Sequence, residues 1–316
     1  MNCEIYSFGE PLAGFYARDE RRLSSTGDFH MTWGGDTSNV AVASAKLGHS
    51  AGYITRVGSD AFGRGLIELW TSSGVNIENA IVDEESPTGM YFVSFNGEKH
   101  EFDYRRKDAA ARKFSPSDAA RVSLEGIKIL HLSGISQAIS RECLEAGFVL
   151  MKRAKELGAM VSYDLNYRGK LWSRDLAKAI YLKTICDFAD IVSMNDDEAE
   201  ILNLPENHEE AVRKIMDMGP KTVAFRRGSQ GAVLGFDGQI LTGKAKRVRV
   251  ADTVGAGDAF TAAILCCILE SQTTDYTLQF ALTAAALTCT ATGSTDGQPT
   301  KKEIRDFLGG NPVTQQ

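Results

Sequence analysis

Residues 252–260, DTVGAGDAF, form the stretch from which the rest of this chain can be interpreted. Two glycines flank an alanine, a carboxylate follows, and an apolar run of small residues continues to residue 269. Glycine lets the backbone approach a ligand closely, and the first N–H groups of a helix have no partner within it. A tight loop that enters a buried helix would therefore form an anion site, with Asp258 in the first helical turn pointing into it.

This arrangement suits phosphoryl transfer. The N–H groups of Gly255, Ala256 and Gly257 would hold developing phosphate charge, while Asp258 would take a proton from the attacking hydroxyl. A well-capped helix with an aspartate in its first turn is the simpler interpretation of the same residues. The chain contains no Gly-Lys-Ser/Thr, and the loop is not Gly-x-Gly-x-x-Gly, so neither common nucleotide-binding signature applies.

The composition fits an ordinary globular protein with a large core. Of the 316 residues, 43% are hydrophobic and 24% are charged. The net charge of −6 argues against nucleic-acid binding, so an anionic ligand must be bound by local Arg, Lys or backbone N–H groups. The six cysteines include no Cys-x-x-Cys, and the five histidines show no metal-ligand spacing. No apolar run reaches the length of a membrane span and no basic, apolar leader opens the chain, so we expect a cytoplasmic protein.

Short strands alternate with helices along most of the chain, which predicts an α/β fold whose central, mostly parallel sheet has helices on both faces. Strands are expected over residues 5–9, 52–57, 128–132, 160–164, 191–193 and 222–225, and helices over residues 38–47, 62–73, 141–157, 174–188, 198–202 and 211–218. Because no linker or repeat divides the chain, we expect a single domain over residues 1–316. Residues 309–316 resemble a frayed tail.

Two segments break this alternation. Residues 11–32 hold no clean helix, and residues 88–106 alternate about an Asn96-Gly97 pair, which is a strong signal for a β-hairpin. We predict that both segments form a small β-sheet, a lid that projects from the main sheet. An exposed lid edge would invite pairing with another copy of the chain, so we expect a homo-oligomer.

Ligands of an open parallel sheet bind beyond the carboxyl ends of its strands, and polar residues follow several predicted strands. After one of them, Arg168 could reach a phosphate or a carboxylate, or it could pair with a neighbouring acid. Asn195 and Glu198 begin a helix, where oxygen ligands could help to hold Mg²⁺ through water or could simply satisfy the helix dipole. Gly34 and Gly35 open another helix, in which Asn39 could bond a sugar hydroxyl or serve only as a cap.

Other segments also leave two interpretations open. Tyr104 and Arg106 share one face of the predicted hairpin and could hold a substrate carboxylate, or they could be solvated on an exposed ribbon. Residues 226–231, RRGSQG, could cover nucleotide phosphates or form a hairpin turn. The Ala- and Thr-rich helix expected over residues 280–292 could pass under an adenine ring or be tightly packed core.

In this order and spacing, the motifs resemble those of the ribokinase-like (PfkB-type) carbohydrate kinases, and the resemblance covers nearly the whole chain. The motifs that carry it are Gly34-Gly35 with Asn39, Asn195-x-x-Glu198, Gly228-x-x-Gly231 and DTVGAGD at residues 252–258. The resemblance implies a ribokinase-like fold, ATP and Mg²⁺ as cofactors, and a small-molecule sugar acid as the partner, while the charge and the lack of a long apolar run argue against nucleic acid and membrane. The resemblance leaves open whether the protein also uses a monovalent cation.

The family resemblance also assigns roles residue by residue. The catalytic residues implied are Asp258 as the base, with Gly255, Ala256 and Gly257 as the anion hole. Glu198 is implied to hold Mg²⁺ through water. The residues implied for ATP are Asn166, Asn195, Arg227, Gly228, Gly231, Gly255, Gly257, Ala286 and Cys289.

Within the family the chain is most similar to the 2-keto-3-deoxygluconate kinases, through residues 131–135 (HLSGI), residues 164–168 (DLNYR) and Tyr104-x-Arg106. This similarity implies ATP-dependent phosphorylation of the primary hydroxyl of a sugar acid. The residues implied to bind the sugar acid are Gly34, Gly35, Asn39, Tyr91, Tyr104, Arg106, Arg168, Asp252 and Asp258. One departure is Arg105, which stands where the subgroup often has a second tyrosine.

Two alternatives remain. Fructokinases share the general motifs but need no cation for a substrate carboxylate. A non-catalytic sensor of a sugar or nucleotide could use the same fold, although the presence of Asp258 with its glycine loop argues for an enzyme.

Overall fold

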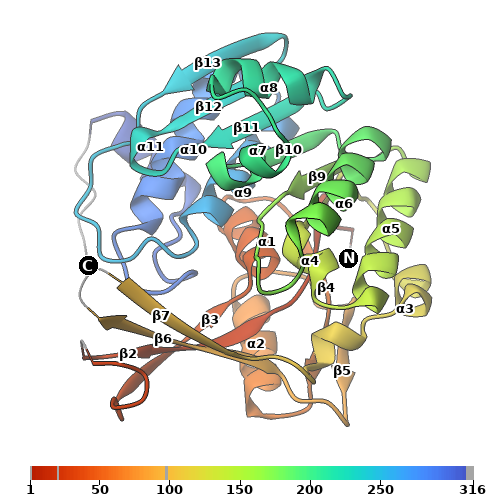
Figure 1. The fold of residues 1–316 in the computed structure, drawn as a ribbon, viewed down its shortest axis with the longest axis vertical. Helices are drawn as coiled ribbons and strands as arrows, with labels where there is room; N and C mark the ends of the chain where they lie inside the picture. Colours follow the sequence, from red (N-terminus) through yellow and green to blue (C-terminus); the bar gives the residue numbers. More distant parts are fainter. Residues whose placement is uncertain (1, 20, 97–98, 311–316) are drawn as a thin grey trace.

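The computed structural model describes residues 2–19, 21–96 and 99–310. The chain forms a nine-stranded sheet, which helices cover on both faces, and a separate four-stranded sheet (Figure 1). The predicted α/β architecture with a small additional β-sheet is therefore confirmed. Within the described ranges, no helix combines the length and apolar character needed to cross a membrane.

The main sheet has the strand order β13-β12-β11-β10-β9-β8-β1-β4-β5. Its strands are β1 (Ile5–Phe8), β4 (Ala51–Gly58), β5 (Ala80–Asp83), β8 (Ile129–Ser133), β9 (Met160–Asp164), β10 (Ile191–Met194), β11 (Thr222–Arg226), β12 (Ala232–Phe236) and β13 (Gln239–Gly243). From β5 to β11 the neighbours pair in parallel, while β12 and β13 add antiparallel ladders. The central strands β1, β8 and β10 are buried along their length, as expected for parallel strands covered on both faces.

The helices cover this sheet in two layers, and each layer has its own apolar core. One core includes side chains of α5, α6, α7 and α8, and the other includes side chains of α1, α9, α10 and α11. Strand β1 serves both, because Ile5 belongs to the second core while Tyr6 and Phe8 belong to the first, in keeping with the two-residue period of a strand. The helices are α1 (Asp36–Lys46), α2 (Ala61–Ser72), α3 (Pro116–Arg121), α4 (Gly134–Ala138), α5 (Arg141–Glu156), α6 (Arg174–Asp187), α7 (Asp196–Ile201), α8 (His208–Met216), α9 (Ala256–Leu269), α10 (Thr274–Thr288) and α11 (Lys301–Leu308), with 3₁₀ turns η1 (Ala110–Lys113) and η2 (Gly228–Gln230).

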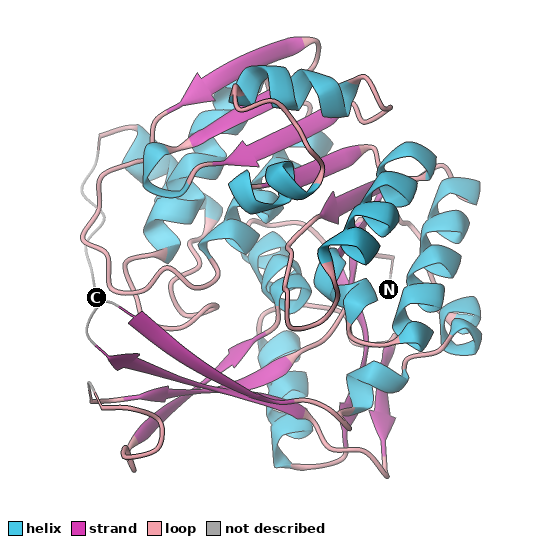
Figure 2. Ribbon diagram, viewed as in Figure 1, coloured by secondary structure: helices cyan, strands magenta, loops and turns pink. Residues whose placement is uncertain are grey.

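The four-stranded sheet brings together the two segments that interrupt the α/β alternation (Figure 2). Its strands are β2 (Leu12–Ala17), β3 (Phe29–Gly34), β6 (Gly89–Asn96) and β7 (Lys99–Arg105), in the order β3-β2-β6-β7. Strands β2 and β6 pair in parallel, and the outer pairs are antiparallel. Gly97 of the predicted turn and residues 311–316 of the predicted tail lie outside the described residues. That copies of the chain associate through this sheet stays a prediction.

Several predicted helix bounds differ from those observed, and helix caps explain the differences. Helix α7 begins at Asp196, earlier than predicted, because the Asn195 side chain accepts hydrogen bonds from the backbone N–H groups of residues 197 and 198. The helix predicted over residues 280–292 is α10, which begins at Thr274 after the Thr273 cap and ends at Thr288.

Candidate active site

A cavity of about 1010 Å³ lies at the carboxyl ends of β1, β8, β9 and β10, and side chains of β6 and β7 line its other side. Ligands of open parallel sheets bind at this edge. The predicted site residues that line the cavity are Gly34, Gly35, Asn39, Tyr91, Tyr104, Arg106, Asn166, Arg168, Asn195, Gly228, Gly255, Gly257 and Asp258.

The other predicted site residues lie outside the cavity lining. Ala256 begins α9 between two glycines that do line it. The Arg227 side chain donates to Gln230 Oε1 over 2.6 Å. The predicted site residues that also lie outside the lining are Asp252, Glu198, Gly231, Ala286 and Cys289.

The Asp252 side chain stabilises the glycine loop through hydrogen bonds with the backbone. One of its carboxylate oxygens accepts a hydrogen bond from the Val254 N–H, and the other accepts one from the Gly293 N–H, both over 3.1 Å. Its side chain is buried. In this structure Asp252 therefore fixes the loop conformation rather than facing the cavity, which differs from the direct substrate contact expected from the sequence.

The glycine loop has the geometry of an anion site. Gly255 is the N-cap of α9 and has φ 83°, a left-handed conformation that favours glycine. A Cβ atom added to Gly255 would collide with the Ser294 backbone carbonyl. The glycine loop and the Asp258 side chain, in the first turn of α9, both line the cavity, while the Ala256 N–H donates to the Thr253 carbonyl over 3.3 Å.

Asp258 is held by an asparagine from another part of the chain. Asn39 Nδ2 donates to Asp258 Oδ2 over 2.7 Å, and Asn39 Oδ1 accepts a hydrogen bond from Ser294 Oγ over 3.1 Å. Asn39 caps no helix, since the start of α1 has no side-chain cap bond. The capping role is therefore not observed, Asn39 orients the candidate base, and a hydrogen bond from Asn39 to a sugar hydroxyl stays a prediction.

The surroundings of Asp258 raise its pKa to about 7. Burial is the largest cause and the Asp36 charge adds to it, while the hydrogen bond from Asn39 and the Arg226 charge act in the opposite direction. The DTVGAGD motif alone indicates a helix N-terminus, which would lower this pKa. The larger effect is the loss of solvent around a carboxylate recessed in a cavity.

A carboxylate–guanidinium pair that the sequence analysis did not assign lies beneath the loop. Arg226, at the end of β11, forms a two-pronged ion pair with Asp164, at the end of β9. The Arg226 guanidinium also lines the cavity, 3.1 Å from where a Cβ atom on Gly257 would lie. Asp164 ends the strand predicted over residues 160–164, and Arg226 directly follows the strand predicted over residues 222–225, so their positions at strand ends were the available signal.

Glu198 completes a capping box at the start of α7. Its two oxygens accept hydrogen bonds from the Tyr167 N–H over 2.8 Å and the Asn195 N–H over 2.7 Å. Burial raises the pKa of Glu198. Among the described residues, no three His, Cys, Asp or Glu side chains gather as a group that could hold a metal ion. This donor set fits Mg²⁺ held through water by one carboxylate, and it does not fit a site made wholly of protein ligands.

Aromatic and basic side chains line the small-sheet side of the cavity. The rings of Tyr91 and Tyr104 stack with centroids 6.0 Å apart, and the Arg106 guanidinium lies 5.5 Å from the centroid of the Tyr104 ring. Gly34 lies against Tyr91, since an added Cβ atom would come within 2.7 Å of the Tyr91 hydroxyl. Arg106 is also paired with the buried carboxylate of Glu10, a residue absent from the predicted site.

Asn166 and Arg168 close the cavity on the side of β9. Asn166 has φ 38° and donates through Nδ2 to Asp36 Oδ2 over 2.8 Å. Arg168 donates to the Tyr167 carbonyl and lies near enough to Tyr104 to favour ionisation of its hydroxyl, although burial raises the Tyr104 pKa overall. The cavity thus has one wall with aromatic and cationic groups and another with amides and a recessed carboxylate.

This fold and this cavity define the class of the protein, an α/β protein with a ligand-sized cavity at the carboxyl ends of its parallel strands. The family model of the pfkB family carbohydrate kinases matches residues 3–301. The chain belongs to this PfkB family.

Individual relatives are similar over nearly their full length. The chain is 29% identical over 320 residues to the 2-dehydro-3-deoxygluconokinase of Bacillus subtilis (strain 168), which covers 100% of this chain and 98% of that protein. It is 31% identical over 318 residues to fructokinase-1 of Oryza sativa subsp. japonica, which covers 96% of this chain and 97% of that protein. A solved ribokinase II candidate from E. coli, in complex with ATP and Mg²⁺, has the same fold, with a TM-score of 0.90 at 24% identity over 98% of this chain and 100% of that one.

Proposed function

We propose that this kinase transfers the γ-phosphoryl group of ATP to the primary hydroxyl of a sugar acid, with 2-keto-3-deoxygluconate (2-dehydro-3-deoxygluconate) as the first candidate. The observation that carries the proposal is the Asp258 carboxylate, which lines the cavity in the first turn of α9 and is oriented by Asn39. A carboxylate in this position can accept a proton from a hydroxyl group, while the helix N-terminus beside it attracts the phosphoryl group.

In the proposed reaction, Asp258 removes the proton of the attacking hydroxyl. A pKa raised to about 7 makes Asp258 a stronger base than an ordinary aspartate and leaves a large fraction of it ionised near neutral pH. The N–H groups of residues 255–257 would stabilise charge on the transferring oxygens. Arg226, which lies beneath Gly257, would add a fixed positive charge on the same side.

ATP is proposed to bind along Asn195, Gly228 and the glycine loop, which line the cavity on the side of β10 and β11. When bound, Mg²⁺ supplies positive charge to the ATP phosphates, and Glu198 would hold it through water. The contacts proposed for the remaining part of the nucleotide are with Asn166, Arg227, Gly231, Ala286 and Cys289.

The sugar acid is proposed to bind against the small sheet. A carboxylate needs a local cation in a chain whose net charge is −6, and Arg106 and Arg168 line the cavity beside the Tyr104 hydroxyl. The likeness to a 2-dehydro-3-deoxygluconokinase supports this choice of substrate. Phosphorylation of fructose is the second candidate, because the identity to a fructokinase is as high.

A substrate panel tests the proposed function directly. We expect ATP consumption on addition of 2-keto-3-deoxygluconate, with a kcat/KM at least tenfold above that for fructose or ribose, where a tenfold ratio corresponds to about 1.4 kcal/mol of differential binding. The galactonate epimer of the acid belongs in the same panel. Faster use of fructose would establish the second candidate, and no ATP consumption with any sugar would favour a non-catalytic sensor.

Replacing Arg106 tests the proposed carboxylate contact. A charged hydrogen bond contributes about 1.5–3 kcal/mol, so we expect Arg106→Met to raise the KM for the sugar acid about ten- to a hundredfold with little change in the KM for ATP. The matched control is Arg105→Met, because the Arg105 side chain is 66% exposed and pairs only with Asp103 in the described structure. A similar loss in both variants would contradict a specific role for Arg106.

A further inference from the structure

Glu10 occupies a central place where the two sheets join. It lies in the short segment between β1 and β2, and Arg106 follows β7 in another segment that connects the sheets. The Glu10 side chain is 0% exposed, the Arg106 side chain is 12% exposed, and the two form an ion pair. Both residues line the cavity. Arg106, the cation proposed above to bind the substrate carboxylate, is therefore already neutralised by a carboxylate of the protein.

The contact that holds Glu10 as an anion is mainly one of charge. Neither of its carboxylate oxygens accepts a well-aligned hydrogen bond from the described part of the chain. Glu198 is different, because each of its oxygens accepts a backbone N–H. The Arg106 guanidinium is the donor in contact with Glu10, and a buried ionised carboxylate is costly unless such a cation stays beside it. Glu10 therefore depends on Arg106 more than an exposed acid would.

The charged groups around Glu10 come from several elements. Arg112 in η1 is a second cation close enough to lower the pKa of Glu10, and Asp36 at the start of α1 raises it. Other titratable groups that interact electrostatically with Glu10 include Tyr53, Tyr104 and Cys143. Burial is the largest influence, and the pKa of Glu10 is raised to about 7.

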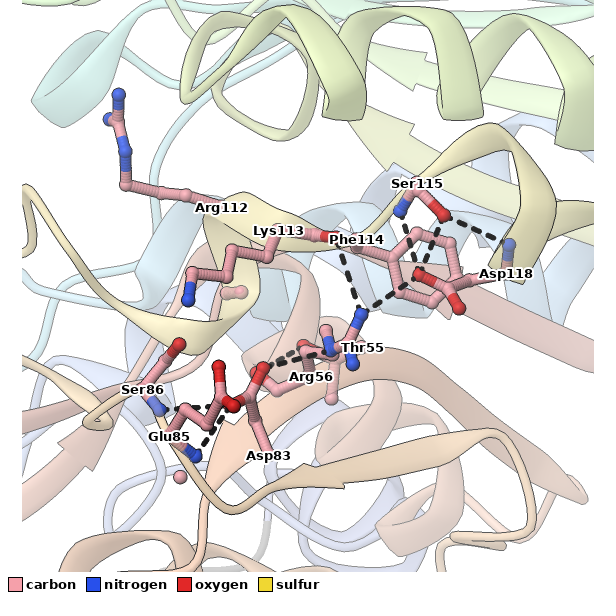
Figure 3. A network of polar contacts seen from close by, with 12 residues as sticks. Thr55, Arg56, Asp83, Glu85, Ser86, Arg112, Lys113, Phe114, Ser115 and Asp118 are labelled. Atoms are coloured by element: carbon pink, nitrogen blue, oxygen red, sulfur yellow. Dashed lines mark hydrogen bonds and ion pairs between the residues drawn. The ribbon is translucent and has the colours of Figure 1, made fainter.

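Arg112 lies in η1, and contacts of Arg56 hold the end of this turn in place, so we do not expect Arg112 to take the position of Arg106. Arg56 on β4 bridges Asp83 over 3.3 Å and Asp118 over 3.1 Å, and it donates to the carbonyl of residue 113 at the end of η1. Figure 3 shows this network and shows the Arg112 side chain extending away from it. Arg106 remains the cation in direct contact with Glu10.

We propose that Glu10 is a positioning residue that sets the kinase's preference between acidic and neutral sugars: it holds Arg106 in the cavity and takes up one proton when a substrate carboxylate pairs with Arg106. The inference rests on the proposed sugar-acid function. The proton comes from solvent and binds a Glu10 oxygen, so the cavity exchanges the protein's negative charge for that of the substrate. A neutral sugar leaves the Glu10–Arg106 pair intact and takes up no proton.

Protonation of Glu10 and binding of the sugar acid are coupled, and the direction in which pH changes the Kd follows from this coupling. Where Glu10 is already protonated, the acid binds Arg106 without further cost, but where Glu10 is ionised, binding must first protonate it. The Kd for the sugar acid therefore rises with pH from about pH 6 to pH 8.5. Asp258 also titrates near pH 7 in the same cavity, so the measurement is made with Asp258→Asn as the parent protein, which removes that group and prevents turnover.

The experiment is isothermal titration calorimetry of 2-keto-3-deoxygluconate at pH 6 and pH 8.5, in two buffers of different ionisation enthalpy. For the Asp258→Asn parent, we expect Kd to rise up to about thirtyfold at the higher pH, with uptake of up to one proton, as a single group with a pKa of about 7 requires. With Glu10→Gln added, we expect Kd to change less than twofold between the two pH values and proton uptake to vanish. With Asp103→Asn added instead, at an exposed ion pair of the small sheet, the linkage should persist.

Two outcomes would overturn the inference. One is proton uptake that survives Glu10→Gln, and the other is an Asp258→Asn parent that binds the acid with no proton uptake at all. The second outcome needs no Glu10 variant to fold, and Arg106→Met provides a further check because it should also abolish the linkage. Failure of the proposed function is a separate result, in which wild type and parent bind no sugar acid at any pH.

Discussion

Asp258→Asn is expected to lower kcat by at least about 10²–10⁴-fold, because general-base catalysis contributes that much to a reaction rate and asparagine cannot accept the proton. The side chain keeps its shape, and its oxygen can still accept the hydrogen bond from Asn39. The affinity for ATP should therefore stay within a fewfold of the wild-type value. A coupled assay of ADP release, with ATP binding measured separately, checks both expectations, and near-normal turnover would exclude Asp258 as the base.

The same variant should alter the pH dependence of the reaction. A base must be ionised to work, so kcat/KM of the wild type should rise with pH up to about pH 7, where the pKa of Asp258 lies. The residual activity of Asp258→Asn should lack this rise. A rise that persists in the variant would assign the titration to another group.

The free energy of unfolding shows whether the Asp258→Asn variant is folded. The direction of its change on substitution follows from the same raised pKa. Because folding raises the pKa of Asp258 from 3.8 to about 7, its stabilising contribution is complete at low pH and is lost as pH rises through about 7. Replacing Asp258 with asparagine should therefore increase the free energy of unfolding, on the order of 2 kcal/mol at pH 8 and less at pH 5. Urea unfolding at the two pH values measures the difference.

The regular α/β part of the fold could be predicted because its signals are local. Strand β9 was expected over residues 160–164 and is observed as Met160–Asp164, a mostly apolar segment that ends in a carboxylate. The loop at residues 255–257 and the first turn of α9 follow from two glycines and an aspartate within a few positions. Propensity, capping and a two- or 3.6-residue period act over such distances.

The site was only partly predictable because its electrostatics depend on strand order. Asp164 and Arg226 are 62 residues apart in sequence and meet because β9 and β11 flank β10. Glu10 and Arg106 meet because the segments that carry them connect the same two sheets. The parallel pairing of β2 with β6 is equally non-local. No local pattern marks these contacts, so sequence patterns indicate candidates for ligand binding without showing which charges are already paired.

The second large effect is expected from the pair beneath the glycine loop. Asp164 and Arg226 have side chains only 4% and 17% exposed, and removing one partner of a buried pair leaves an uncompensated charge that costs about 3–5 kcal/mol. Asp164→Ala should therefore lower the free energy of unfolding by that amount. The control is Asp187→Ala in the exposed Lys183–Asp187 pair of α6, which should cost less than about 1 kcal/mol.

Removing both charges separates the structural role of this pair from its catalytic one. The variant Asp164→Ala/Arg226→Met removes both charges of this pair, so it should recover part of the stability lost in Asp164→Ala. The recovery is partial because Glu198 and Asp258 lose the Arg226 charge that favours their ionised forms. If Arg226 only supported the fold, the double variant would also recover activity. Because the guanidinium lies in the cavity against Gly257, we expect kcat to remain about 10²-fold below wild type, as for the loss of one preorganised group facing transition-state charge. Unfolding curves and initial rates measured on the same preparations distinguish a structural role of Arg226 from a catalytic one. A stable double variant with wild-type kcat would show that Arg226 has only a structural role.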